Sequence, residues 1–259
     1  MNKNFNKLVN EFRVIAKKRW IQSQHTGHGT VGLTFEKELG KKIDTDYSPD
    51  YNGIELKCTT RFSRFPISLF SVAFDGPTNK EIVRLNETYG SYDKDFKNKK
   101  TLIRKIRCKE LSLLNNYYLS LEIMEDKLFL CVYDKNKKII EKESYVYLDT
   151  IKKHLNRKIH QLALIKASKK NIDNIEYFRY YLITLYTLKS FDTFLNLLKE
   201  GEIEVTIISR INKTGITSGR YYNKNLVFQI KKSNIEKLFN KIYSYDHDKM
   251  ESLEELQHL

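Results

Sequence analysis

The sequence has few of the residues that crosslink or interrupt a chain. Its 259 residues include three cysteines, three prolines and one tryptophan. Cys58, Cys108 and Cys131 form no CxxC pair and are odd in number, which argues against a disulfide scaffold and against a zinc site. Few prolines predict few long irregular linkers. The chain is long enough for one large domain or for two smaller lobes with a hydrophobic core.

Long hydrophobic runs are missing as well. The longest apolar stretch, residues 180–188, is shorter than the ~18–20 residues that a membrane-spanning helix needs. Residues 1–10 are polar and lack the apolar centre of a signal peptide. We therefore expect a cytoplasmic protein that binds no membrane.

Acidic residues are outnumbered by basic ones. The chain has 46 Lys and Arg against 32 Asp and Glu, which gives a formal net charge of +14. Clustered basic side chains gain affinity for a polyanion by releasing counterions from its phosphates, so the charge predicts a nucleic-acid partner. An AT-rich genome also produces sequences rich in Lys, Asn and Ile without selection for DNA binding, and this alternative stays open on charge alone.

The first quarter of the chain predicts two helices, a loop and a small β unit. Residues 4–19 place apolar side chains on one helical face. Residues 24–32 contain three glycines and predict a loop. A helix is expected from Thr34 to Gly40, and residues 43–60 predict a short β unit around a tight turn.

The rest of the chain alternates between strand and helix patterns, which predicts an α/β or α+β fold. Strands are expected at 67–74, 117–124, 128–134, 159–167, 202–209 and 226–231, and helices at 148–156, as a pair within 174–200, and at 233–242. The strongly basic segment 94–109 predicts either a nonspecific DNA clamp or a disordered, solvated stretch.

The most informative stretch runs from Ser48 to Lys57. Residues two apart in a strand share a face, so Glu55 and Lys57 should point together while Leu56 points into the core. The Asn52-Gly53 pair predicts a tight turn that folds the chain back and lets Asp50 approach Glu55. The sequence thus predicts two carboxylates that converge beside an ammonium group.

Hydrolysis of a phosphodiester needs groups of this kind. Asp50, Glu55 and the carbonyl oxygen of Leu56 would hold Mg²⁺, which prefers oxygen ligands and activates a bound water. Lys57 would orient that water and offset the charge that develops on the phosphate. The alternative is that this Glu-x-Lys pattern is only the solvated polar edge of a strand.

The same stretch resembles a known family. The segment PDYNGIELK, preceded by GHGTVGLTFEKELG, is similar to the MvaI/BcnI type II restriction endonucleases and, more distantly, to the MutH type of mismatch-repair nicking enzymes. Three later segments also fit the family: KIHQLALIKA at 158–167, LLKEGEIEVTI at 197–207 and LVFQIKKSNIEKLF at 226–239. The likeness covers residues 24–60 and 145–240 and is weak between them.

The resemblance implies the PD-(D/E)xK, MutH-like fold: a mixed sheet flanked by helices, in two lobes around a DNA cleft. A catalytic nuclease lobe is expected at 1–170 and a DNA-recognition lobe at 171–259. The implied activity is Mg²⁺-dependent hydrolysis of double-stranded DNA at a short site, with Mn²⁺ able to substitute and 5′-phosphate ends as products. The resemblance further implies a monomer, and a separate cognate DNA methyltransferase that acts on the same site.

The resemblance also assigns roles to individual residues. Asp50, Glu55 and Lys57 become the catalytic trio, and Glu36 becomes an accessory carboxylate or else a helix-surface residue. His28 and Thr30 lie in the glycine-rich loop that would approach the DNA backbone, unless that loop is only a flexible tip.

The presumed base-reading region departs from the family pattern. The family reads CC-GG sites with an acidic residue and an arginine where this chain has Thr206 and Ile208. Arginine pairs with guanine, whereas Gln and Asn suit adenine, so we expect a target other than CCNGG. The expected DNA contacts, which could instead be chance charges on a solvated loop, are Arg210, Lys213, Ser218, Arg220, Tyr221, Asn223, Lys224 and Gln229, with Arg61 and Arg64 after the catalytic strand.

Three alternatives remain open on the sequence. A MutH-like nickase would use the same residues but cut one strand with the help of partner proteins. A catalytically silent, sequence-specific DNA-binding protein would keep the carboxylates for structure alone. A modification-dependent nuclease would be separated from the main hypothesis by comparing methylated with unmethylated DNA.

Overall fold

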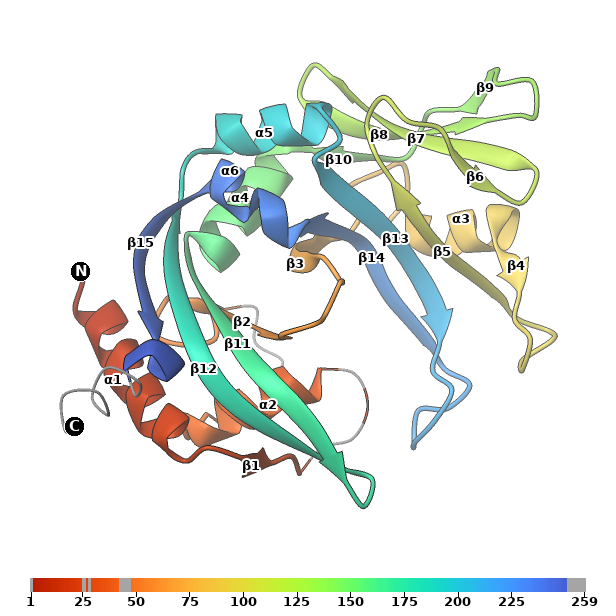
Figure 1. Ribbon diagram of the computed structural model, residues 1–259. Coiled ribbons are helices and arrows are strands. Elements are labelled where there is room, and N and C mark those ends of the chain that lie inside the picture. The colour runs from red at the N-terminus through yellow and green to blue at the C-terminus, as the bar shows by residue number, and fades with distance from the viewer. Residues whose placement is uncertain (1, 25–26, 28, 42–47, 251–259) are drawn as a thin grey trace, which may run out of the picture. The chain divides into compact units, whose positions relative to one another are not determined.

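The computed structural model describes residues 2–24, 27, 29–41 and 48–250 of the chain (Figure 1). Two compact units are interleaved along the sequence. The first unit comprises residues 1–65, 157–189 and 239–259, and the second comprises residues 66–156 and 190–238. Helix α4 (Leu148–Ile159) begins in the second unit and ends in the first.

The first unit is built on a mixed five-stranded sheet. Its strands follow the order β1-β12-β11-β2, and β15 also pairs with β12. The pairing of β2 with β11 is parallel and the other pairings are antiparallel. The elements are α1 (Lys3–Lys17), β1 (Ile21–Gln22), α2 (Thr30–Glu38), β2 (Glu55–Thr60), β11 (Gln161–Ile172), β12 (Ile175–Leu188) and β15 (Phe239–Asp246).

One face of this sheet carries the hydrophobic core of the first unit. Helix α1 begins at its cap Asn2, whose side chain accepts a hydrogen bond from the N–H of Phe5 at 2.8 Å. The apolar face of α1 packs with Phe35 of α2 and with alternate residues of β11, among them Ala163 and Ile165. Because side chains alternate along a strand, the intervening residues of β11 lie on the opposite face.

The second unit contains two antiparallel sheets. One has the order β3-β14-β13-β5-β4, and the other has the order β10-β8-β7-β6 with β9 paired to β8. The elements are β3 (Ile67–Val72), α3 (Glu81–Tyr89), β4 (Ser91–Tyr92), β5 (Lys100–Ile106), β6 (Ser112–Leu114), β7 (Tyr117–Met124), β8 (Lys127–Tyr133), β9 (Ile139–Glu141), β10 (Tyr145–Tyr147), α5 (Phe191–Lys199), β13 (Ile203–Ile211), β14 (Tyr221–Ile230), the 3-10 turn η1 (Lys232–Asn234) and α6 (Ile235–Leu238).

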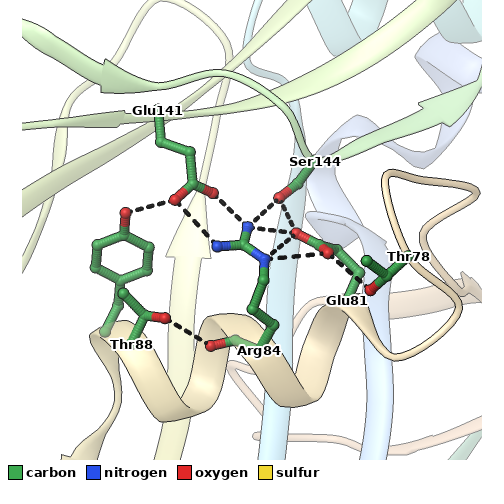
Figure 2. Close-up of polar contacts among 7 residues, drawn as sticks. Thr78, Glu81, Arg84, Thr88, Glu141 and Ser144 are labelled. Atoms are coloured by element: carbon green, nitrogen blue, oxygen red, sulfur yellow. Dashed lines mark hydrogen bonds and ion pairs between the residues drawn. The ribbon is translucent and has the colours of Figure 1, made fainter.

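A polar cluster fastens α3 to the segment that follows β8. The guanidinium of Arg84 pairs with Glu81 and Glu141, each at 2.5 Å, as Figure 2 shows. Ser144 donates to Glu81 at 2.5 Å, and Tyr89 donates to Glu141 at 2.6 Å. Since Glu81 and Ser144 are buried, these bonds offset the cost of removing the carboxylate from water.

Two of the expected helices are wrong. The first of the pair expected within 174–200 is strand β12, which pairs with β11 and β15. Its run of aromatic and β-branched residues favours a strand, and the neighbouring strands supply the hydrogen bonds. The helix expected at 233–242 is limited to Ile235–Leu238, after which Phe239 begins β15. The helices at 148–159 and 191–199 are confirmed.

The division of the chain also differs from the expected boundary at residue 170. Strand β2 pairs with β11 and β15 pairs with β12, so three segments that lie far apart in sequence form one sheet. Part of the basic segment 94–109 is strand β5, which lies in the sheet between β13 and β4, so the disordered alternative is wrong for that part. In the part of the chain that the structure describes, no helix is long and apolar enough to cross a membrane.

Candidate active site

Strand β2 positions Glu55 and Lys57 on one face of the first unit's sheet. It pairs in parallel with β11, so that Glu55 lies beside Leu162 and Lys57 beside Leu164. The intervening Leu56 is buried in the core with α1 and α2. Glu55 and Lys57 therefore point to the opposite face, as the alternation predicts.

A tight turn returns Asp50 to this strand. Tyr51 and Ile54 exchange backbone hydrogen bonds of 2.9 and 2.8 Å across Asn52 and Gly53, whose φ angles are 46° and 85°. Such positive φ values at both central positions are typical of the type I′ turn that Asn-Gly favours. The turn places Oδ2 of Asp50 3.0 Å from the N–H of Leu56, which donates to it.

This hydrogen bond also fixes the direction of the Leu56 carbonyl. The N–H and C=O of one residue in an extended strand point to the same side. Among the described residues β2 has a partner strand only in β11, and the Leu56 N–H points to Asp50. The Leu56 carbonyl oxygen therefore faces the free edge of β2, on the side where Asp50 lies.

Three lysines surround the two carboxylates. Lys57 Nζ lies 2.5 Å from Oε1 of Glu55, and Lys158 Nζ lies 3.0 Å from Oε2 of the same residue. Lys158 also lies 3.8 Å from Oδ1 of Asp50, and Lys41 lies 3.3 Å from that oxygen. The side chain of Glu55 is only 2% exposed, so its charge depends on these partners.

The electrostatic surroundings separate the two carboxylates. Burial alone raises the pKa of Asp50, but Lys57, the Leu56 N–H, Lys158 and Lys41 outweigh it and lower the pKa below its usual value. Burial dominates at Glu55 and, with the charge of Asp50, keeps its pKa above the usual value against the pull of Lys57. Asp50 is thus the stronger acid of the pair.

The donor set fits a hard divalent cation. Within the described residues no group of three or more His, Cys, Asp or Glu side chains is placed to hold a metal. The ligands available are the carboxylates of Asp50 and Glu55 with the carbonyl of Leu56, all oxygen donors of the kind that Mg²⁺ prefers. Because the ammonium group of Lys158 contacts both carboxylates, one small cation can reach both.

The accessory positions are less close to the carboxylate pair. Glu36 of α2 lies 3.9 Å from Lys41, which in turn contacts Asp50. Burial and then the charge of Asp50 raise the pKa of Glu36. Thr30 begins α2 and donates its hydroxyl to Glu176 at 2.5 Å, whereas His28 lies outside the described residues.

The expected base-reading residues gather on the hairpin of β13 and β14 in the second unit. Arg210 stacks its guanidinium 4.9 Å from the ring centre of Tyr222, and Lys99 lies 5.7 Å from the ring centre of Tyr221. The exposed members of the expected set are Arg210, Lys213, Ser218, Arg220, Tyr221, Asn223 and Lys224. In the first unit, Arg61 and Arg64 are exposed after β2.

Several of these side chains have partners within the second unit. Lys213 forms ion pairs with Asp93 and, at 3.0 Å, with Asp95, and Ser218 donates to the carbonyl of Lys213 at 3.1 Å. Asn223 accepts a hydrogen bond from Ser209 at 2.8 Å.

Gln229 is held on both sides of its amide. Its Oε1 accepts from Thr206 at 2.6 Å, and its Nε2 donates to Ser68 at 3.1 Å.

The sequence did not single out Lys41 or Lys158. Lys158 lies in the segment KIHQLALIKA, which resembles the family and predicts a strand at 159–167 but no site residue. Lys158 comes three residues before β11, and the parallel pairing of β11 with β2 brings it to Glu55. In the sequence, the only sign of Lys158's role is a basic residue just before an apolar strand. That pattern does not predict which strand β11 pairs with.

Residues 9–239 match the model of the MvaI/BcnI restriction endonuclease family. The chain belongs to this family. It is accordingly a type II, site-specific restriction endonuclease, which hydrolyses DNA and depends on a divalent metal ion. No curated protein matches the sequence.

Solved structures agree with this assignment. A complex of restriction endonuclease MvaI with its cognate DNA substrate matches with a TM-score of 0.87 at 22% identity, over 93% of this chain and 98% of that chain. MvaI in the absence of DNA matches with a TM-score of 0.57 at 21% identity over the same shares. At these identities the likeness shows the fold, and it confirms the expected PD-(D/E)xK class.

Proposed function

We propose that Asp50, Glu55 and the Leu56 carbonyl hold Mg²⁺ in this restriction endonuclease and that Lys57 acts on the attacking water. The main observation in support is the hydrogen bond from the Leu56 N–H to Asp50. With this bond, both Asp50 and the Leu56 carbonyl lie at the edge of β2 beside Glu55. When bound, the metal ion polarises the phosphate and lowers the pKa of a bound water. Mn²⁺, which also takes oxygen ligands, is expected to substitute.

The residues of the site divide the work. The ammonium group of Lys57 sits against Glu55 at 2.5 Å and is held where it can orient a water and stabilise charge on the phosphate. Asp50, whose pKa is low, stays ionised at neutral pH. Lys41 and Lys158 offset the negative charge of the pair and favour the approach of a phosphate.

The wider expectations follow from the family and from the chain's charge. We infer that the substrate is duplex DNA with a short site other than CCNGG, that the products carry 5′-phosphates, and that the enzyme acts as a monomer. The hairpin residues of β13 and β14 would read bases, with Arg61 and Arg64 on phosphates. An enzyme that cuts cellular DNA also requires protection, so a separate methyltransferase for the same site is expected.

The test is digestion of unmethylated phage DNA with Mg²⁺, followed by sequencing of the fragment ends. The Lys57→Ala variant and an EDTA lane are the negative controls, and Lys17→Ala on the exposed side of α1 is the matched control for loss of one charge. Discrete fragments from wild type and Lys17→Ala alone would support the proposal and give the target site. Discrete fragments from Lys57→Ala would refute the role of Lys57.

Other outcomes separate the alternatives. Nicked but uncut plasmid would indicate a MutH-like nickase, and cleavage of methylated DNA alone would indicate a modification-dependent nuclease. Tight, site-specific binding with no cleavage under any metal would indicate a catalytically silent binding protein. Fragment ends that map to CCNGG would refute the expected change of target.

A further inference from the structure

Strand β2 is shorter than the strand beside it. Thr60 ends β2 opposite Ala167, and the backbone N–H of Arg61 donates to the Ala167 carbonyl at 2.9 Å. Beyond this point β11 continues to Ile172 and pairs with β12 on its other side (Figure 1). On the side of β2, the described residues provide no strand for 168–171.

Among the residues that the structure describes, nothing pairs with the backbone of β11 at this edge. The Ala167 carbonyl points toward β2, and groups of alternate residues in a strand point to the same side. The N–H groups of Lys169 and Asn171 accordingly face the open edge. Backbone N–H groups at an edge are ready donors to phosphate oxygens.

Side chains around this edge form a pocket of about 460 Å³. It is lined by Thr60, Arg61, Phe62, Ser168, Lys169, Lys170 and Asn171. Three of these side chains are basic, and none is acidic. A second pocket beside Arg61 is lined by Asp246 and Asp248 as well. Of these two pockets, we therefore expect the first to favour an anion.

An aromatic ring stands at the mouth of the pocket. Phe62 is 87% exposed, with the guanidinium of Arg61 5.9 Å from its ring centre. Such an exposed ring next to basic groups suits the sugar of a nucleic-acid backbone, which offers an apolar surface between phosphates.

Part of the pocket lining lies on the same face of the sheet as the candidate active site, whereas Thr60, Lys169 and Asn171 lie on the opposite face. Lys57 pairs with Leu164, and alternation along β11 then puts Lys166, Ser168 and Lys170 on the face of Lys57. Lys170 is six residues along β11 from Leu164, so it lies about 20 Å along the strands from Lys57, whereas Arg61, four residues after Lys57, lies about 13 Å along. Twenty ångströms is the length of about six base pairs of duplex, so Lys170 is too far from Lys57 to touch the phosphate that is cut.

We propose that this pocket binds the deoxyribose-phosphate backbone of the DNA substrate at a distance from the cut, with Arg61 and Lys170 on phosphates and Phe62 on a sugar. This inference rests on the proposed function, because it takes duplex DNA as the ligand. The contact is independent of base sequence and adds affinity for DNA beyond the recognition site.

Binding of a mixed-sequence duplex in EDTA, measured over a range of salt concentrations, tests the proposal without cleavage. Arg61→Gln and Lys170→Gln should each reduce the slope of log K against log salt by about 0.9, since each removes one phosphate contact. Phe62→Ala should weaken binding about fivefold and leave the slope unchanged, and Phe62→Tyr should bind like wild type. The matched controls are Phe65→Ala, which is 78% exposed but outside the pocket lining, and Lys17→Gln on α1.

The fluorescence of Trp20 provides a local signal for DNA binding at the pocket. It is the single tryptophan, and Lys170 lies 4.4 Å from the centre of its ring. Saturating DNA should change tryptophan emission in wild type, and Lys170→Gln should abolish that change while its fold, followed by circular dichroism, stays intact.

The proposal is overturned if Phe62→Ala binds like Phe65→Ala, if the salt slopes of the basic variants equal that of Lys17→Gln, or if DNA leaves Trp20 emission unchanged. Digestion with Mg²⁺ is scored separately. If wild type cuts DNA but the basic variants keep the wild-type salt slope, the pocket proposal is rejected and the nuclease function is retained. If wild type does not cut DNA but the basic variants have a reduced salt slope, the pocket proposal is retained and the catalytic roles are rejected.

Discussion

The ammonium nitrogen of Lys158 lies 3.0 Å from Oε2 of Glu55 and 3.8 Å from Oδ1 of Asp50. One positive charge is thus shared by two carboxylates, of which Glu55 is almost fully buried. Two such carboxylates repel each other unless a cation lies near both. Lys158 can therefore stabilise the site before a metal ion binds, and a bound metal ion would take over part of that role.

Replacing Lys158 with Gln is expected to lower the free energy of unfolding by about 2 kcal/mol without metal, because it leaves the buried Glu55 with less compensation. Mg²⁺ should then raise the melting temperature of the variant more than that of wild type. Thermal unfolding in EDTA and in Mg²⁺ measures both effects.

Lys153→Gln is the control for the Lys158 experiment. It removes a lysine from the same helix, α4, whose side chain is 75% exposed and pairs with Asp149. An equal response of Lys158→Gln and Lys153→Gln to Mg²⁺ would contradict the shared-cation account.

Glu36 offers a test of the accessory carboxylate. Its oxygen lies 3.9 Å from Lys41, which bridges it to Asp50, and burial followed by the charge of Asp50 raises its pKa. Removing its negative charge should weaken attraction for a divalent cation. We expect Glu36→Gln to need several times more Mg²⁺ for half-maximal cleavage while keeping the rate at saturation within about threefold.

Glu38→Gln on the same helix is the matched control, because Glu38 pairs with Lys18 at 2.7 Å and not with the site. A titration of cleavage rate against Mg²⁺ distinguishes the two variants. The helix-surface interpretation of Glu36 would be favoured if both variants titrate like wild type.

The arrangement of Asp50, Glu55 and Lys57 could be predicted because it is local. An Asn-Gly turn and the alternation of one strand determine which side chains meet, and both are legible within ten residues of sequence. Lys158 could not be predicted in the same way, since it meets Glu55 only through a pairing between β2 and β11 that spans more than a hundred residues.

The error at β12 has a similar origin. Ile175, Phe178, Leu182 and Leu185 are spaced as on one helical face. The alternate residues Phe178 and Tyr180 also fit one face of a strand. Two neighbouring strands, β11 and β15, decide between these readings, and the local sequence contains neither. The same pairings explain why a single boundary along the chain did not describe the two units.

The cluster around Arg84 predicts a pH dependence of stability in the second unit. Burial raises the pKa of Glu81, but hydrogen bonds from Arg84, Ser144 and Thr78 outweigh it and leave the pKa below the usual value. A lowered folded-state pKa gives stability that is present above the unfolded-state pKa and is lost as pH falls through the folded-state value.

Glu81→Gln should therefore lower the free energy of unfolding by about 2 kcal/mol at pH 7, because it breaks a buried charge-assisted network. The difference from wild type should shrink as pH falls below the unfolded-state pKa of about 4.3 and through the lower folded-state pKa of Glu81. Urea unfolding from neutral to acid pH measures this. Glu87→Gln, an exposed position of α3, controls for loss of one negative charge, and a gap that stays constant with pH would contradict the account.

Gln229 and Thr206 link base recognition to a hydrogen bond inside the sheet. Thr206 donates to Oε1 of Gln229 at 2.6 Å and thereby fixes the orientation of the amide. If Gln229 reads one base pair, Gln229→Leu should lose about tenfold or more discrimination at that position, and Thr206→Val should lose a similar amount although it touches no base.

Neither variant should change the salt dependence of binding, since no phosphate contact is removed. Cleavage of substrates substituted at each position of the target site, compared with wild type, measures the discrimination. Ser120→Ala is the matched control, because it removes a buried hydroxyl of the second unit that donates to the carbonyl of Arg107 and not to an expected DNA contact. Unchanged discrimination in Gln229→Leu would show that the amide serves only to join β13, β14 and β3. A loss of discrimination in Gln229→Leu but not in Thr206→Val would show that the amide reads the base without the hydrogen bond from Thr206.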